Sequence, residues 1–386
     1  MNLLRRKFFG AILFLFVCSF NTQAQQNNSA TVTQIVFTSD VHYGIWRKHF
    51  RGADEVPAYI VNAAQVKQIN KLPDAILPND DGIAAGKKIS YIDYIAVTGD
   101  IANRQEPPSQ SASISWKQFI NDYVDNITVK SRTNHQPSLL LVPGNHDVSN
   151  AIGYSKPMDP LTDAGSMAGI YNLMMQPAVP KTKDTYNYAT DKINYSKDIA
   201  GVHFIFITIW PDASNIAWMQ NDLAKVKSTV PVVIFTHDPP EGDPQHFINP
   251  HEPHTINAKD KFQNLLSEQF KDDPKAEPLN DDIEQRAFVA FLKLHPNIKA
   301  YFHGHNNANE FYNYKGPDND ISLPVFRVDS PMKGKPSSTD ETKLSFQLIS
   351  IDPASKEMTV RECLWNTEPK NPTAPIVWGQ SLTIKL

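Results

Sequence analysis

The sequence predicts an α/β fold, because short buried strands alternate with amphipathic helical segments along most of the chain. Apolar runs with the length and composition of buried strands occur at residues 35–37, 94–97, 139–142, 204–209, 232–235 and 300–302. Between these runs, apolar residues recur at helical spacing, and each set is expected to form the buried face of a helix. The sets are Ile114, Phe119, Tyr123 and Ile127; Ile216, Met219, Leu223 and Val226; and Ile283, Ala287, Phe291 and Leu294.

The C-terminal part of the chain has a different pattern. Apolar and polar residues alternate at residues 344–348 and again around 358–361, as in strands with one buried face. These strands are expected to complete a sheet from about residue 344, so residues 34–386 are predicted to form a single domain. Two loop-rich segments, 151–193 and 241–279, are longer than simple connections and are predicted to be lids or binding walls.

The N-terminus has the features of a secretory signal peptide over residues 1–24. Basic residues at positions 5–7 precede an apolar stretch, 8–20, that is shorter than the roughly 20 residues of a membrane-spanning helix. Small residues follow at 22–24, as expected near a cleavage point. The polar segment 25–33 is predicted to be a disordered leader.

Beyond this signal, Cys363 is the only cysteine, so no intramolecular disulfide is possible. Secreted animal enzymes of this length usually have several disulfides, so the chain is predicted to be a periplasmic or secreted bacterial protein. The bulky Val17 before Cys18 argues against lipid attachment at that cysteine. No later apolar run has spanning length, so no transmembrane segment is expected. The net charge is −4 without a basic block after the signal, which argues against a nucleic acid duplex as a partner.

Metal-binding side chains follow five of the predicted strands, at the point where each strand ends. Sites form at the carboxyl ends of strands in α/β sheets, because loops there vary without disturbing the core. Carboxylate, amide and imidazole groups together suit first-row divalent ions such as Mn, Fe, Zn or Co. Each short match is weak alone, and the prediction depends on the order and context of the whole set. The segments are Asp40-Val41-His42, Gly99-Asp100, Gly144-Asn145-His146-Asp147, His237-Asp238-Pro239-Pro240 and Gly304-His305-Asn306-Asn307.

This ordered series resembles the calcineurin-like metallophosphoesterase superfamily. The resemblance implies a four-layer αββα sandwich, in which two mixed β-sheets are flanked by helices. It also implies two divalent metal ions as cofactors, with Asp100 bridging them. The first ion is then expected at Asp40, His42, Asp100 and Asn307, and the second at Asp100, Asn145, His237 and His305.

The resemblance also implies a mechanism. Two cations about 4 Å apart clamp a phosphate and lower the pKa of a bridging water, whose hydroxide attacks phosphorus. His146 is then expected to stabilise or protonate the leaving oxygen, and Asp147 to orient its imidazole.

The sequence departs from the superfamily pattern at Asn307, where a histidine is usual. An amide oxygen still ligates such ions, as in the similar periplasmic 5′-nucleotidase branch, but a weaker first site is expected. Two segments, 237–242 and 304–311, resemble the acid-sphingomyelinase-like phosphodiesterase branch. Three further histidines lie in a proline-rich loop and are predicted to belong to a polar lid rather than to a metal site. They are His246, His251 and His254.

The predicted function is hydrolysis of a small phosphate ester, with a phosphodiester or nucleotide-type substrate slightly preferred. The alternative is a non-catalytic exported protein that binds a phospho-ligand or metal, with a decayed first site at Asn307. His146 favours catalysis, because it is not a metal ligand in the implied scheme and a binding protein has little need of it. The sequence leaves the ester, the metal and the oligomeric state open.

Overall fold

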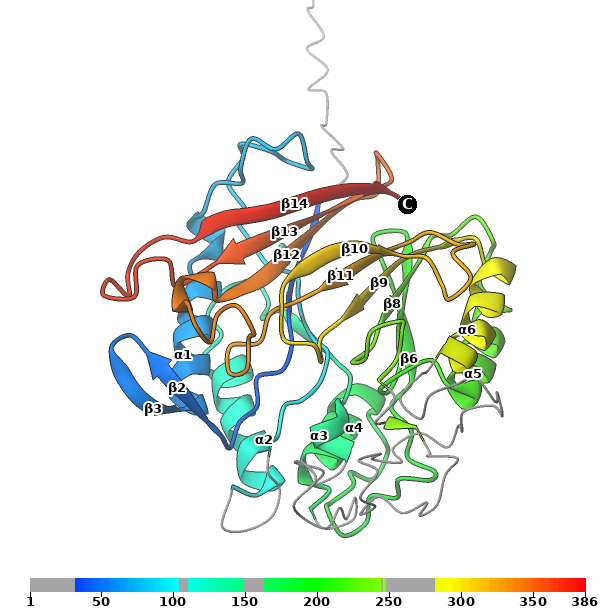
Figure 1. The fold of residues 1–386 in the computed structure, drawn as a ribbon, viewed down its shortest axis with the longest axis horizontal. Helices are drawn as coiled ribbons and strands as arrows, with labels where there is room; N and C mark the ends of the chain where they lie inside the picture. Colours follow the sequence, from blue (N-terminus) through cyan, green and yellow to red (C-terminus); the bar gives the residue numbers. More distant parts are fainter. Residues whose placement is uncertain (1–31, 104–109, 149–162, 244–245, 248–281) are drawn as a thin grey trace, which may run out of the picture.

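The fold is a sandwich of two six-stranded sheets with helices on its outer faces (Figure 1). The computed structural model describes residues 32–103, 110–148, 163–243, 246–247 and 282–386. The predicted signal peptide, Cys18 and leader residues 25–31 lie outside these ranges, whereas Thr33, predicted to end the disordered leader, is instead the buried first residue of a strand. None of the helices in the described ranges is both long enough and apolar enough to cross a bilayer.

The first sheet joins N-terminal, parallel strands to C-terminal, antiparallel ones. Its order is β14 (Val377–Lys385), β13 (Glu357–Leu364), β12 (Ser345–Asp352), β1 (Thr33–Thr38), β4 (Tyr94–Val97) and β5 (Ser138–Leu141). β1, β4 and β5 are parallel, whereas β12 pairs antiparallel with β1 and is followed by β13 and β14. The period-two segments of the sequence are therefore strands of this sheet.

The second sheet is also mixed. Its order is β10 (Glu310–Tyr314), β11 (Leu323–Arg327), β9 (Ile298–His303), β8 (Val232–Phe235), β7 (Val202–Phe206) and β6 (Tyr195–Ile199). Four neighbours, β11, β9, β8 and β7, are parallel, and the strands at the two edges are antiparallel. A separate hairpin is formed by β2 (Trp46–Phe50) and β3 (Ala53–Pro57).

Helices cover the outer face of each sheet, which gives the four layers that the resemblance implied (Figure 1). Side chains of α1 (Ala58–Ile69) and α2 (Ala112–Ile120) share a core with the outer face of the first sheet. Side chains of α5 (Ala213–Leu223) and α6 (Asp282–Leu294) do the same on the second sheet. Two further helices, α3 (Asn145–Val148) and α4 (Gly165–Met175), follow β5.

An aromatic cluster holds the inner faces of the sheets together. The rings of Phe235 and Phe302 are stacked with centroids 4.5 Å apart, and Phe37 packs edge-on against both at 5.4 Å. Each of these strands alternates its side chains between the inner core and the helix-covered core. Because Phe37, Phe235 and Phe302 lie near the carboxyl ends of β1, β8 and β9, this packing also fixes the loops that follow.

Several sequence predictions are confirmed, and others need correction. Strands β4 and β8 coincide with the predicted runs, whereas β5 begins one residue early and β7 ends at Phe206. In α2 the predicted face is wrong at Ile114, which is 49% exposed. In α6 it is wrong at Leu294, which is 72% exposed, and at the exposed Ala287, because the stripe that meets the sheet is centred on a neighbouring face of the helix. The buried face of α6 is instead formed by Phe288, Val289, Phe291 and Leu292.

The two long segments predicted as lids or walls are described only in part. Residues 163–193 include the helix α4, so this part of the first segment is not a simple loop. Residues 241–243 and 246–247 of the second segment pack beside the ligand loops, and Phe247 is buried against Trp210. The rest of both segments lies outside the described residues.

Candidate metal centre

The predicted ligands lie at one edge of the sandwich, because the strands that precede them run parallel. The loops after β1, β4 and β5 of the first sheet contain Asp40, His42, Asp100 and Asn145, and those after β8 and β9 of the second contain His237, His305 and Asn307. The backbone N–H of His305 donates a hydrogen bond of 2.9 Å to Oδ2 of Asp40. The two sheets therefore contribute to one site.

The backbone of these loops adopts conformations that side chains rarely allow. Five of the predicted ligands have φ between +42° and +61°, namely Asp40, His42, Asp100, His305 and Asn307. Such positions cost about 1–3 kcal/mol each and cluster at functional sites. Gly304 and Gly144 complete the arrangement, because a Cβ at either would lie 2.2–2.3 Å from a carboxylate oxygen of Asp40 or Asp100.

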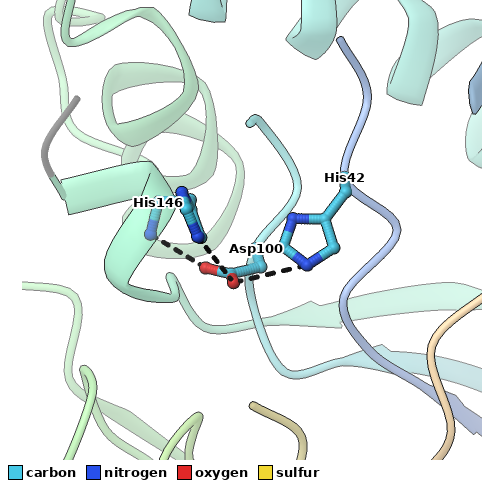
Figure 2. A group of neighbouring side chains, drawn as sticks. All are labelled: His42, Asp100 and His146. Atoms are coloured by element: carbon cyan, nitrogen blue, oxygen red, sulfur yellow. Dashed lines mark hydrogen bonds and ion pairs between the residues drawn. The ribbon is translucent and has the colours of Figure 1, made fainter. Parts of the chain in front are cut away.

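The carboxylate of Asp100 lies at the middle of the site, with 2% of the residue exposed. Its Oδ1 is 3.5 Å from Nε2 of His237, and its Oδ2 is 3.6 Å from Nε2 of His42 and 4.0 Å from Nε2 of His146. Figure 2 shows this carboxylate between the rings of His42 and His146. The backbone N–H of His146 also donates to Oδ1, at 2.9 Å. The position suits the bridging role implied for Asp100.

The ring of His237 is fixed by a contact across the two sheets. Its Nδ1 donates to the carbonyl of Thr98 at 2.6 Å, which directs Nε2 into the site. There Nε2 is 3.1 Å from Oδ1 of Asn145 and 3.3 Å from Nδ1 of His305. These are the protein groups that the resemblance assigned to the second ion.

The electrostatics of the site favour a positive charge. Burial alone lowers the pKa of His237, yet the nearby carboxylates, chiefly that of Asp100, raise this pKa to about 10. Burial opposes ionisation of Asp100, but the neighbouring histidines lower its pKa well below the usual range. Burial and Lys333 lower the pKa of His42, so its imidazole is neutral and retains a lone pair for a metal.

The donor set fits metal ions, as the polar atoms that lack other partners show. Among the described residues, Oδ1 of Asp40 and both ring nitrogens of His42 are buried without a hydrogen-bond partner. Leaving such groups unsatisfied costs about 1–3 kcal/mol each. Two groups that share Asp100 have ligand atoms within 4.8 Å of one another, one with Asp40 and His237, the other with His42 and His146. Asp40 Oδ1 and His42 Nε2 are themselves 3.6 Å apart.

Asn307 lies beside the site, and its geometry leaves one ligand atom available. Its Nδ2 donates to the carbonyl of His305 at 2.7 Å, and its Oδ1 is buried without a hydrogen-bond partner in the described part of the chain. The amide oxygen is thus the atom left to bind an ion. Whether Asn307 ligates the first ion stays a prediction.

His146 and Asp147 differ in what they contact. The His146 side chain is 14% exposed at the mouth of the site, whereas that of His42 is 1% exposed. The Asp147 carboxylate accepts hydrogen bonds from the backbone N–H groups of Ile101, Ala102 and Gly144 at 2.9–3.1 Å. Asp147 therefore ties the Asp100 and Asn145 loops together. Its proposed orientation of the His146 ring stays a prediction.

Sequence reasoning missed two features of the site. Nζ of Lys333 is 3.3 Å from Nε2 of His146, and no motif marks this lysine in the sequence. His246, predicted to belong to a polar lid, is buried and its Nδ1 is 2.6 Å from Oδ2 of Asp238. Nε2 of His305 is 2.7 Å from Oδ2 of Asp243. These four side chains form a second group, for which the sequence signal was Asp238, because it directly follows the ligand His237. His251 and His254 lie outside the described residues.

A two-sheet αββα sandwich with this ligand set at its strand ends defines a metal-dependent phosphoesterase. The family model for the calcineurin-like phosphoesterases matches residues 33–318, most of the chain, so the chain belongs to this family. It is accordingly a hydrolase of phosphoric ester bonds.

Three solved structures are among those similar to the chain. A Vps29 from Entamoeba histolytica in complex with zinc has 8% identity and a TM-score of 0.32, covering 91% of this chain and 99% of that one. The phosphopantetheinyl hydrolase PptH from Mycobacterium tuberculosis has 11% identity and a TM-score of 0.33, covering 78% and 90%. The calcineurin-like phosphoesterase YfkN from Bacillus subtilis has 12% identity and a TM-score of 0.29, covering 92% and 90%. No curated protein matches the chain.

Replacing the central carboxylate is expected to empty the site. In Asp100→Asn the charge that holds the cations is lost, so metal affinity should fall by more than about 100-fold, beyond the usual cost of losing an outer partner. Elemental analysis after dialysis measures the bound metal. Asp74→Asn, whose side chain is 84% exposed, is the matched control and should retain wild-type metal. Equal metal content in both variants would show that Asp100 is not a ligand.

Proposed function

We propose that the chain hydrolyses phosphodiester or nucleotide-type esters with a dinuclear metal centre. The observation that supports two ions is the position of Asp100, whose two carboxylate oxygens face different sets of ligands. Oδ1 faces His237 of the second set and Oδ2 faces His42 of the first, and His146, which belongs to neither set, is also near Oδ2. The first ion is assigned to Asp40, His42, Asp100 and Asn307, and the second to Asp100, Asn145, His237 and His305.

When bound, the ions neutralise the phosphate charge and lower the pKa of a water to near neutral. The residues around them have separate tasks. Asp40 and Asp100 supply negative charge, and the carbonyl of Thr98 orients His237. His146 lies at the mouth with Nε2 4.0 Å from Asp100, outside the assigned ligand sets, and is placed to hold or donate a proton at the leaving oxygen.

A cavity lined in part by the segment that follows His42 motivates the preference for an ester with a sizeable organic group. It has a volume of about 840 Å³ and begins at Gly44, two residues after the ligand His42. Trp46 and Tyr59 line it and are 66% and 48% exposed, so their rings are available for stacking. A diester or nucleotide has such a group next to the phosphate, whereas a small monoester has little to fill this space.

The alternative function is a protein that binds a phospho-ligand or metal without catalysis. His146 argues against it, because this partly exposed histidine lies outside the assigned ligand sets.

We also propose that the protein is exported to the periplasm or the medium, because its N-terminal segment is basic and then apolar.

The direct test is hydrolysis of a panel of aryl phosphate monoesters, aryl phosphodiesters and nucleotides. Activity should disappear on chelation and return with Mn, Zn, Fe or Co, because the donor set suits first-row ions. Diesters or nucleotides should have the higher kcat/KM. If the metal-loaded protein hydrolyses none of these substrates, the binding-protein function is correct instead.

His146→Ala should lower kcat by roughly 10²- to 10⁴-fold while both metals stay bound. The loss should be largest for esters with poor leaving groups, because an activated aryl oxide needs little protonation. Steady-state kinetics over a leaving-group series, with metal content measured in parallel, gives both readouts. His295→Ala is the control, because this histidine directly follows α6 and precedes β9, at the opposite end of that strand from His305. Metal loss in His146→Ala would make His146 a ligand, and an equal loss for all leaving groups would exclude the proposed role.

A further inference from the structure

Lys333 lies at the mouth of the centre, on a loop that follows the last parallel strand of the second sheet. Its Nζ is 3.3 Å from Nε2 of His146, the group assigned to the leaving oxygen. The loop, residues 330–337, begins after β11 and has no counterpart among the ligand segments of the sequence. It therefore adds a cationic side chain that the ligand series does not include.

The loop is attached to both ends of the ligand series. Oγ of Ser330 donates to the carbonyl of Asp40 at 2.7 Å and accepts the backbone N–H of Lys333 at 2.9 Å. The backbone N–H of Lys335 donates to the carbonyl of Asn307 at 2.6 Å. The backbone of Lys333 is thus fixed relative to the first and the last ligand loops.

A buried arginine holds the loop from behind. Arg47, 3% exposed, donates from its guanidinium to the carbonyls of Pro331, at 2.8 Å, and of Ser337. Gly334 permits the tight turn between them, because a Cβ there would lie 2.3 Å from Oδ1 of Asp329 and 2.8 Å from the carbonyl of Ser330. A loop held at this many points fixes the backbone from which the Lys333 side chain extends to His146.

We propose that Lys333 Nζ is an anion subsite, beside His146, that binds the phosphoryl group of the substrate. Nζ is 3.3 Å from Nε2 of His146, so a phosphate whose leaving oxygen faces His146 also reaches Nζ, and an ammonium group has three N–H donors. This inference rests on the proposed function for its substrate, but the subsite itself requires only that phosphate binds.

The test is titration calorimetry of inorganic phosphate into the metal-loaded protein, which needs no turnover. Lys333→Met removes the charge and keeps the length of the side chain, so phosphate affinity should fall about 10- to 100-fold. Lys333→Arg should restore most of it. Lys335→Met, on the same loop with an exposed side chain, is the matched control and should bind phosphate as the wild type does.

Metal content and Tm are measured for every variant, because a structural role would change them. The subsite is excluded if the wild type binds no phosphate, or if Lys333→Met binds it as tightly as the wild type. The subsite is also excluded if Lys333→Met lowers metal content or Tm along with phosphate affinity and Lys333→Arg does not restore phosphate affinity. That result would indicate a structural role for Lys333. Hydrolysis separates the two proposals. Phosphate binding through Lys333 without ester hydrolysis would contradict the proposed function alone, and hydrolysis with unchanged phosphate affinity in Lys333→Met would contradict the subsite alone.

Discussion

The arrangement depends on two buried carboxylates, Asp40 and Asp100, held between the two sheets. They are 0% and 2% exposed, and burying unpaired charge costs several kcal/mol per ion. Protonated His237 offsets part of this charge, because the carboxylates raise its pKa to about 10, but burial and Lys333 lower the pKa of His42, which stays neutral. Cations are therefore part of what stabilises this edge of the sandwich. This requirement explains why side chains from both sheets converge there, and why a hydrogen bond from His305 to Asp40 joins them.

The strained backbone of the ligand loops depends on the packing of the strands behind them. Left-handed backbone at Asp40, His42 and Asp100 is unfavourable in isolation and persists because the packed strands behind it are rigid. The stacked rings of Phe235 and Phe302, with Phe37 against them, provide that support at the ends of three ligand-bearing strands. Packing in the inner core thus fixes where the ligand loops begin. The hydrogen bonds from backbone N–H groups to Asp147 hold the loops to each other.

Much of this was predictable, because the fold and the clustering of the motif residues follow from local signals. Strands β4 and β8 matched their apolar runs, and the motif residues at the strand ends lie together at one edge of the sandwich as predicted, while their roles as ligands stay predictions. Lys333 was not predictable, since its approach to His146 depends on a loop held by the distant Arg47. The face of α6 was misjudged because spacing alone does not say which stripe meets a sheet. His246 was misjudged for a similar reason, as its partner Asp238 becomes close only in the folded chain.

The most direct measurement of the central claim is a crystal structure of the Mn-loaded protein with anomalous scattering data. Two peaks about 4 Å apart, with Asp100 between them, are predicted. The peak beside Asp40, His42 and Asn307 should have the lower occupancy, because a neutral amide binds such ions less strongly than imidazole does. A single peak, or two peaks that Asp100 does not bridge, would contradict the account.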